Sequence, residues 1–66
     1  MLRGTVLDFD EDAGLGVVLG DDGRRYPFHC AQIADGTRTI APGTAVWVEI
    51  VAGQLGRWEA SAVAAV

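Results

Sequence analysis

The chain has 66 residues, half of them apolar, and its formal net charge at pH 7 is −4. We expect one small domain over residues 1–66, with a compact core because a chain of this size buries only about 60% of its unfolded surface. The single cysteine, Cys30, excludes an internal disulfide and a cysteine-rich zinc cluster, and no apolar run approaches bilayer length. With no cationic and apolar leader visible, we expect a cytoplasmic, reduced setting and no membrane partner.

The first predicted strand covers Gly4–Phe9, where apolar and polar positions alternate. This alternation places Val6 on one side of the sheet. It places three residues on the other side: Thr5, Leu7 and Phe9.

Turn signals separate this strand from the next two. An acidic turn at residues 10–14 leads to a second predicted strand, Leu15–Leu19. The sequence Gly-Asp-Asp-Gly at 20–23 is a strong hairpin signal, and Tyr26–Cys30 forms the third strand.

The second half of the chain contains two further predicted strands. Residues 31–40 are irregular, with room for one helical turn near Gln32 and Ile33. The strand Ala45–Val51 alternates cleanly, and Arg57–Val63 is the last strand. The predicted inward residues of the fourth strand are Val46, Val48 and Ile50, and the outward ones are Trp47, Glu49 and Val51. Five short strands without a helical repeat predict an all-β fold, a small closed antiparallel barrel that leaves no unpaired edge.

Several segments together resemble the bacterial cold-shock domain, over essentially the whole chain. The matching segments are Met1-Leu2-Arg3-Gly4-Thr5-Val6 with Phe9, the frame Gly14-x-Gly16, Phe28-His29 with Ile33, and Gly43-x-Ala45-Val46-x-x-Glu49-Ile50-Val51-x-Gly53 with Gly56. The resemblance implies a five-stranded barrel of the oligonucleotide-binding type that holds single-stranded DNA or RNA and acts as a chaperone or regulator.

This chain departs from the family pattern at the positions that would touch the nucleic acid. Rings or cations of the family are replaced by Leu7, Asp8, Ala13, Leu15, Val17, Pro27, Cys30, Thr37 and Leu55. Phe9 and His29 are retained, and Arg38 keeps a cation beside Thr37. Base-on-ring stacking contributes on the order of 1–3 kcal/mol per base, so the resemblance implies a weakened affinity.

The charge balance also predicts a weakened affinity for nucleic acid. Nine acidic residues face five basic ones, all of them arginine, whereas affinity for nucleic acid usually rests on cations that release counterions from phosphates. Asp8, Asp10, Asp12 and Gly14 have a spacing that suggests a calcium loop, but Leu19 stands where a closing Glu is needed. An acidic solvated turn is the better interpretation, and we expect no metal and no cofactor.

His29 either contacts a base, as the resemblance implies, or is an exposed strand residue without a ligand. Because neighbours in a strand point to opposite faces, His29 and Cys30 are not expected to act as a pair. Nothing else combines a nucleophile with a base, so we expect no catalytic residue and no enzymatic activity.

Two hypotheses follow for function. In the first, the chain is a cold-shock-like protein that binds single-stranded RNA or DNA weakly. Its predicted contact residues are Phe9, Leu15, Val17, His29, Arg38, Arg57 and Trp58. In the second, it is an interaction module that has lost nucleic-acid binding and uses Trp47, Trp58 or the aliphatic face on a protein partner or a second copy. The two tryptophans are either such contacts or packing over the end of the barrel.

Overall fold

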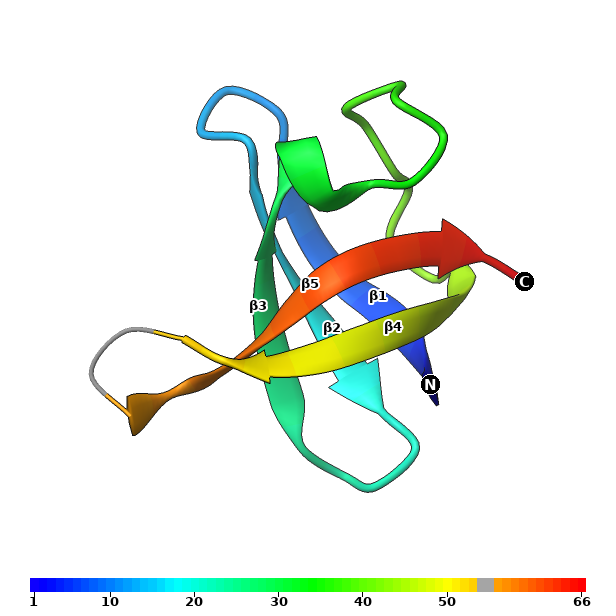
Figure 1. Cartoon of the computed structure of the whole chain (residues 1–66). Helices are drawn as coiled ribbons and strands as arrows, with labels where there is room; N and C mark the ends of the chain where they lie inside the picture. Colours follow the sequence, from blue (N-terminus) through cyan, green and yellow to red (C-terminus); the bar gives the residue numbers. More distant parts are fainter. Residues whose placement is uncertain (54–55) are drawn as a thin grey trace.

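A computed structural model describes residues 1–53 and 56–66, so Leu55 lies outside the described residues. The described chain is all-β, with five antiparallel strands in one sheet, as predicted (Figure 1). The elements are β1 (Leu2–Asp10), β2 (Leu15–Gly20), β3 (Arg25–His29), the short 3₁₀ helix η1 (Cys30–Gln32), β4 (Ala45–Ala52) and β5 (Trp58–Ala65). The strand order across the sheet is β3-β2-β1-β4-β5. No helix among residues 1–53 and 56–66 has the length and apolar character needed to cross a membrane.

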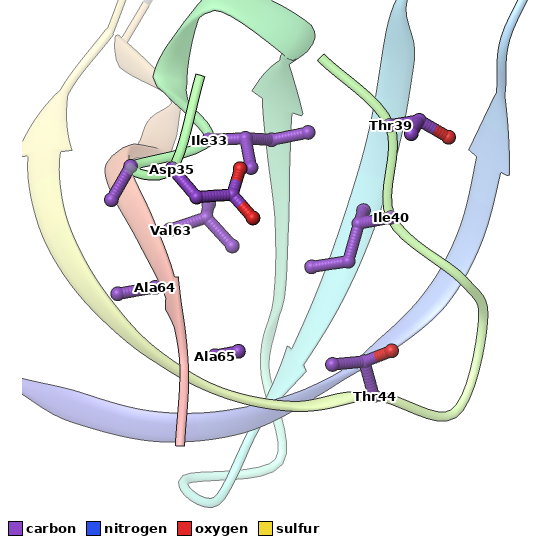
Figure 2. Close-up of a pocket in the computed structure, with 9 residues that line it drawn as sticks. Ile33, Asp35, Thr39, Ile40, Thr44, Val63, Ala64 and Ala65 are labelled. Carbon is purple, nitrogen blue, oxygen red and sulfur yellow. The ribbon is translucent and has the colours of Figure 1, made fainter. Parts of the chain in front are cut away.

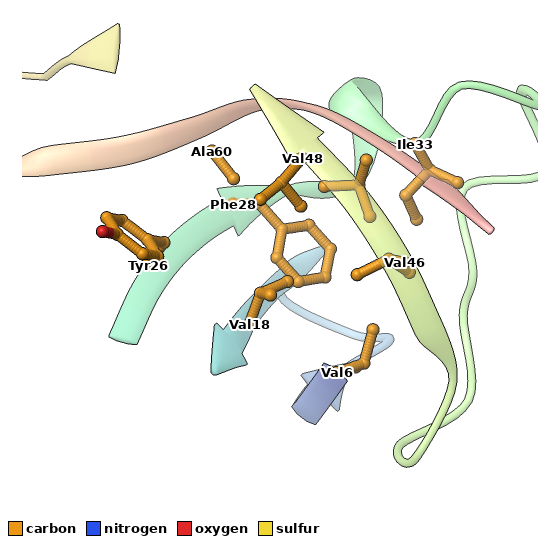
Figure 3. Close-up of a cluster of buried hydrophobic side chains, with 9 residues drawn as sticks. Val6, Val18, Tyr26, Phe28, Ile33, Val46, Val48 and Ala60 are labelled. Atoms are coloured by element: carbon orange, nitrogen blue, oxygen red, sulfur yellow. The ribbon is translucent and has the colours of Figure 1, made fainter. Parts of the chain in front are cut away.

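The core lies on the concave side of the curved sheet (Figure 3). All five strands and the segment after η1 contribute to it, and its members are Val6, Val18, Tyr26, Phe28, Ile33, Val46, Val48, Ala60 and Val63. The predicted alternation of β4 is confirmed, because Val46 and Val48 are fully buried while Trp47 is exposed. The core is built largely from valine, whose branched side chain suits a pleated, buried surface.

The sheet is not closed into a barrel, and this corrects the sequence-based expectation. β5 crosses β3 and contacts it (Figure 1), but no ladder joins the two strands within the described residues. The segment after η1, and not β3, is joined to β5 by a parallel bridge between Ile33 and Val63, where Ala34 N–H donates to Val63 O at 2.7 Å.

Pro27 supplies a physical reason for the missing ladder. At the two ends of the β2–β3 pair, Cys30 N–H donates to Gly14 O and Gly20 N–H donates to Arg24 O. Hydrogen-bonded and non-hydrogen-bonded pairs alternate along an antiparallel ladder. Counted from these two ends, Val17 and Pro27 form a non-hydrogen-bonded pair, so the Pro27 nitrogen is directed away from β2. That nitrogen carries no hydrogen and cannot donate across to β5.

A β-bulge at Leu7 changes which residues of β1 face the core. Val6 pairs with Val18 and Asp8 pairs with Val17, which leaves Leu7 without a partner. The extra residue resets the alternation, so the prediction that Phe9 lies on the side opposite Val6 is wrong. Phe9 is half-buried, packs against the core and sits opposite Gly16.

The β2–β3 hairpin is closed where the sequence predicts it. Gly23, with φ of 83°, provides the left-handed residue of the turn, and its N–H donates to Gly20 O at 2.9 Å. The Asp22 carboxylate accepts from Arg24 N–H and from the Tyr26 hydroxyl. The hydrogen bond from Tyr26, with that from Arg24 N–H, lowers the pKa of Asp22, and the same contact raises the pKa of Tyr26.

Candidate ligand-binding face

The side of β1, β2 and β3 that points away from the core, called the outer face below, is built from three rows of side chains across the strands. The rows run in the order β1, β2, β3, and they are Asp10–Leu15–His29, Asp8–Val17–Pro27 and Thr5–Leu19–Arg25. The period of two along each strand brings these residues to one side. Sequence positions up to 24 apart thus form one continuous surface.

The middle of the outer face is aliphatic and slightly hollowed. A depression of about 360 Å³ is lined by Ala13, Leu15, Val17 and Pro27, with Asp8 and Asp10 along its β1 side and Gly16 and Phe28 beneath. Leu15 is 55% exposed, although it is a large apolar side chain. An exposed apolar surface rimmed by polar groups is typical of an interaction site.

The charges on the outer face are separated by position. Asp8 and Asp10 stand on β1, whereas Arg25 stands on β3 at the far end of the β2–β3 pair. Asp10 Oδ1 also accepts from the N–H groups of Asp12 and Ala13, at 3.0 and 3.2 Å, and so holds the acidic turn. The face therefore has a negative corner and a positive corner with apolar residues between them.

His29 is held in a defined orientation at the end of β3. The ring Nδ1 accepts from the backbone N–H of Ala31 at 3.2 Å, and the backbone N–H of His29 donates to Gln32 Oε1 at 2.8 Å. These two bonds form a reciprocal cap on η1. Since Nδ1 is the acceptor, the neutral ring carries its proton on Nε2. The outer face thus offers one oriented ring N–H donor beside Leu15.

The geometry also corrects the expected separation of His29 and Cys30. The strand ends at His29 and η1 begins at Cys30, so strand alternation no longer applies between them. The Cys30 Sγ lies 3.7 Å from His29 Nδ1. The thiol is partly buried and packs against the core, and an added Cβ on Gly14 would come within 2.9 Å of Sγ.

The outer face continues from β1 onto β4 through a cation and a ring. Arg3 pairs with Trp47 across β1 and β4, and the Arg3 guanidinium carbon is 5.9 Å from the ring centroid. Trp47 is 39% exposed and lies outside the core cluster, as does Trp58, which is 53% exposed. Arg3 and Arg25 were missed in the sequence-based site because only the strand register joins them to Leu15 and Val17.

Only some of the predicted contact residues therefore lie together on the outer face. Leu15, Val17 and His29 share the outer face, whereas Phe9 lies at the edge of the core. The remaining predicted contacts belong to other elements. Arg38 lies in the loop between η1 and β4 with φ of 60°, and Arg57 and Trp58 lie where the β4–β5 hairpin returns.

A second hollow, of about 510 Å³, lies between the loop after η1 and the end of β5 (Figure 2). Ile33, Ile40 and the carboxylate of Asp35 point into it. Asp35 Oδ1 accepts from Thr37 N–H at 3.0 Å and from the Thr37 hydroxyl at 2.8 Å, and these bonds lower the pKa of Asp35. The carboxylate therefore already serves to order its own loop.

No group of three or more metal-ligating side chains occurs in the part of the chain that the structure describes. Comparison of the sequence with protein-family models gave no match, and a search of curated proteins found no significant relative.

Proposed function

We propose that this chain binds single-stranded nucleic acid weakly, in the cytoplasm, through the outer face of β1–β3 and its continuation at Arg3 and Trp47. The observation that carries the proposal is the set of rows that places Leu15 and Val17 between an oriented His29 ring and Arg25. The resemblance of the sequence to cold-shock domains supports the same ligand class, and the all-β sheet is compatible with it.

The chemistry of the face assigns different parts of a strand to different residues. Bases pack on the aliphatic centre and on the Trp47 ring, and the Nε2–H of His29 donates to a base acceptor. Phosphates lie on the side of Arg3 and Arg25, because Asp8 and Asp10 repel them from the opposite corner. The proposal thus moves the cationic contacts from the predicted Arg38 and Arg57 to residues that share a surface with Leu15.

The same residues set the strength of binding. Aliphatic side chains replace rings on most of the face, so we expect a dissociation constant of about 0.1–1 mM at low salt. Two arginines at phosphates give a salt dependence with a slope of about −1.4 in log K against log salt.

A titration of the protein with oligo-dT and oligo-U, monitored by tryptophan fluorescence at several salt concentrations, tests the proposal. We expect Arg3→Ala and Arg25→Ala each to weaken binding and to reduce the salt slope. Arg38→Ala, Arg57→Ala and Trp58→Ala are the comparison variants and should bind as the wild type does. Absence of binding at millimolar oligonucleotide would overturn the proposal, and loss of binding only in the Arg57 and Trp58 variants would move the site to the β4–β5 hairpin.

A second candidate function, binding of a protein partner, is favoured by one observation. The two carboxylates beside the aliphatic depression disfavour phosphate but suit a partner that brings cations.

A further inference from the structure

The outer face carries a charge pattern that complements itself. Asp10 and Arg25 occupy opposite corners of the three-strand patch, with Val17 at its centre and Asp8 beside Asp10. A two-fold interface joins the same patch on both copies, so each feature must meet its complement elsewhere on that patch. A surface with one acidic corner, one basic corner and an apolar middle satisfies this condition.

We propose that the outer face of β1–β3 packs against the same face of a second copy of this chain. A two-fold axis lying in the plane of the face and crossing β2 near Val17 brings the acidic corner of each copy over Arg25 of the other. The same rotation places Val17 against its symmetry mate and Leu15 against Pro27 of the other copy. The strands of the two sheets then cross steeply, which is one of the two favoured geometries for packing sheet on sheet.

The charges argue for a face-to-face pair, and the sheet edge argues against strand addition. Pro27 directs a nitrogen without hydrogen toward the open side of β3, so a ladder with another chain there would lose a hydrogen bond. On the face itself Leu15 and Pro27 are exposed and Val17 is half-buried. A second copy can therefore contact them without any rearrangement of the core.

The size of the patch limits the strength of the pair. A standard interface buries about 800 Å² on each partner. The described chain exposes 4220 Å² in all, so an interface of that size would take up a large part of its surface. A three-strand patch is smaller than such an interface, so we expect a reversible pair that forms only at high protein concentration and weakens as salt screens the Asp and Arg contacts.

This inference does not depend on the proposed nucleic-acid binding, although both use the outer face. Protein at high concentration and a single strand would compete for Leu15 and Val17. The experiment below contains no nucleic acid, so its failure leaves the proposed function untouched.

The test is sedimentation equilibrium over a wide range of protein concentration, with charge-swap variants. We expect the wild type to show a concentration-dependent mass approaching that of a dimer. Asp10→Arg and Arg25→Asp should each weaken association by about tenfold, and the double variant should restore it, because the exchanged charges at the two facing corners again oppose each other. Glu49→Arg and Arg57→Asp carry the same charge changes outside the β1–β3 patch and should associate as the wild type does.

Two results would overturn the proposal. One is a wild type that stays monomeric at every concentration; the other is association that the charge swaps leave unchanged or that the double variant fails to restore. Circular dichroism checks that each variant is folded. Amide chemical shifts of the wild type as a function of concentration give an answer that needs no variant. Under the proposal the changes cluster at Leu15, Val17 and Leu19, and changes confined to other elements would contradict it.

Discussion

The ring of Phe9 is stacked on the ring of Phe28, with centroids 5.9 Å apart and planes 9° from parallel. This contact fixes Phe9 at the edge of the core, although the sequence suggested an exposed position. Phe28 is itself buried, so neither ring is presented on the outer face of β1–β3. The aliphatic character of that face is therefore a property of the fold as well as of the sequence.

Adding rings to the outer face should strengthen binding of single strands. Leu15→Phe and Val17→Phe each supply a flat surface in the middle of the patch, and each ring should add about 1–3 kcal/mol of binding free energy. Fluorescence anisotropy with labelled oligo-dT measures the change. Val51→Phe, which adds a ring on the exposed side of β4, is the control and should leave affinity unaltered. If the control gains as much as the two face variants, the outer face is not the binding surface.

Removing the stacked ring of Phe9 should affect stability more than binding. Phe9→Leu keeps an apolar side chain but loses the stack on Phe28, at a cost of about 1 kcal/mol in the free energy of unfolding. Urea unfolding gives this value, and Leu7→Ala, at the exposed bulge, should change it little. A Phe9→Leu variant with unchanged stability and much weaker oligonucleotide binding would instead restore Phe9 to the binding site.

Gly16 permits the close approach of Phe28 to β2. An added Cβ would lie 2.5 Å from Phe28 Cζ and 2.9 Å from the backbone oxygen of Asp8. Gly16→Ala should therefore lower the free energy of unfolding by about 1–3 kcal/mol.

Because the smaller side chain of leucine makes room, Phe28→Leu in the Gly16→Ala background should cost less than in the wild type. Strictly additive losses in urea unfolding would show that the Phe28 ring is not what constrains position 16.

The contact between Tyr26 and Asp22 should make part of the stability depend on pH. The pKa of Asp22 is lowered on folding, so its contribution is present above the unfolded pKa and is lost as pH falls through the folded one. Tyr26→Phe should lower the melting temperature at neutral pH, and its difference from the wild type should shrink between about pH 5 and about pH 2. A constant difference over that range would contradict the assignment. The pKa of Asp35 is also lowered, by its bonds to Thr37, but Asp35 is present in both proteins and its contribution cancels in the comparison.

The sequence predicted the features that depend on local pattern. The alternation of Val46 and Val48 and the glycines around the turn at 20–23 are sufficient to place β4 and the β2–β3 hairpin. The bulge at Leu7 could not be predicted, since an unpaired residue leaves no mark on a period of two. The open side between β3 and β5 depends on the direction of the Pro27 nitrogen, which is known only once the register with β2 is known.

In the candidate site, too, some residues could be predicted from local pattern and others only from the strand register. Leu15, Val17 and His29 could be assigned to one surface from their spacing along two neighbouring strands. Arg3 and Arg25 reach it only through the pairing of β1 with β4 and of β2 with β3. The contact of Cys30 with His29 depends on the strand ending at His29, which the sequence placed one residue later.

The most direct measurement of the central claim is an amide chemical-shift titration of dilute protein with oligo-dT at low salt. We predict saturable shifts that cluster at Leu15, Val17 and His29 and extend to Arg3 and Trp47, with little change at Arg38, Arg57 and Trp58. Shifts confined to the loop after η1 or to the β4–β5 hairpin, or no shifts at millimolar oligonucleotide, would contradict the assignment of the outer face as the binding surface.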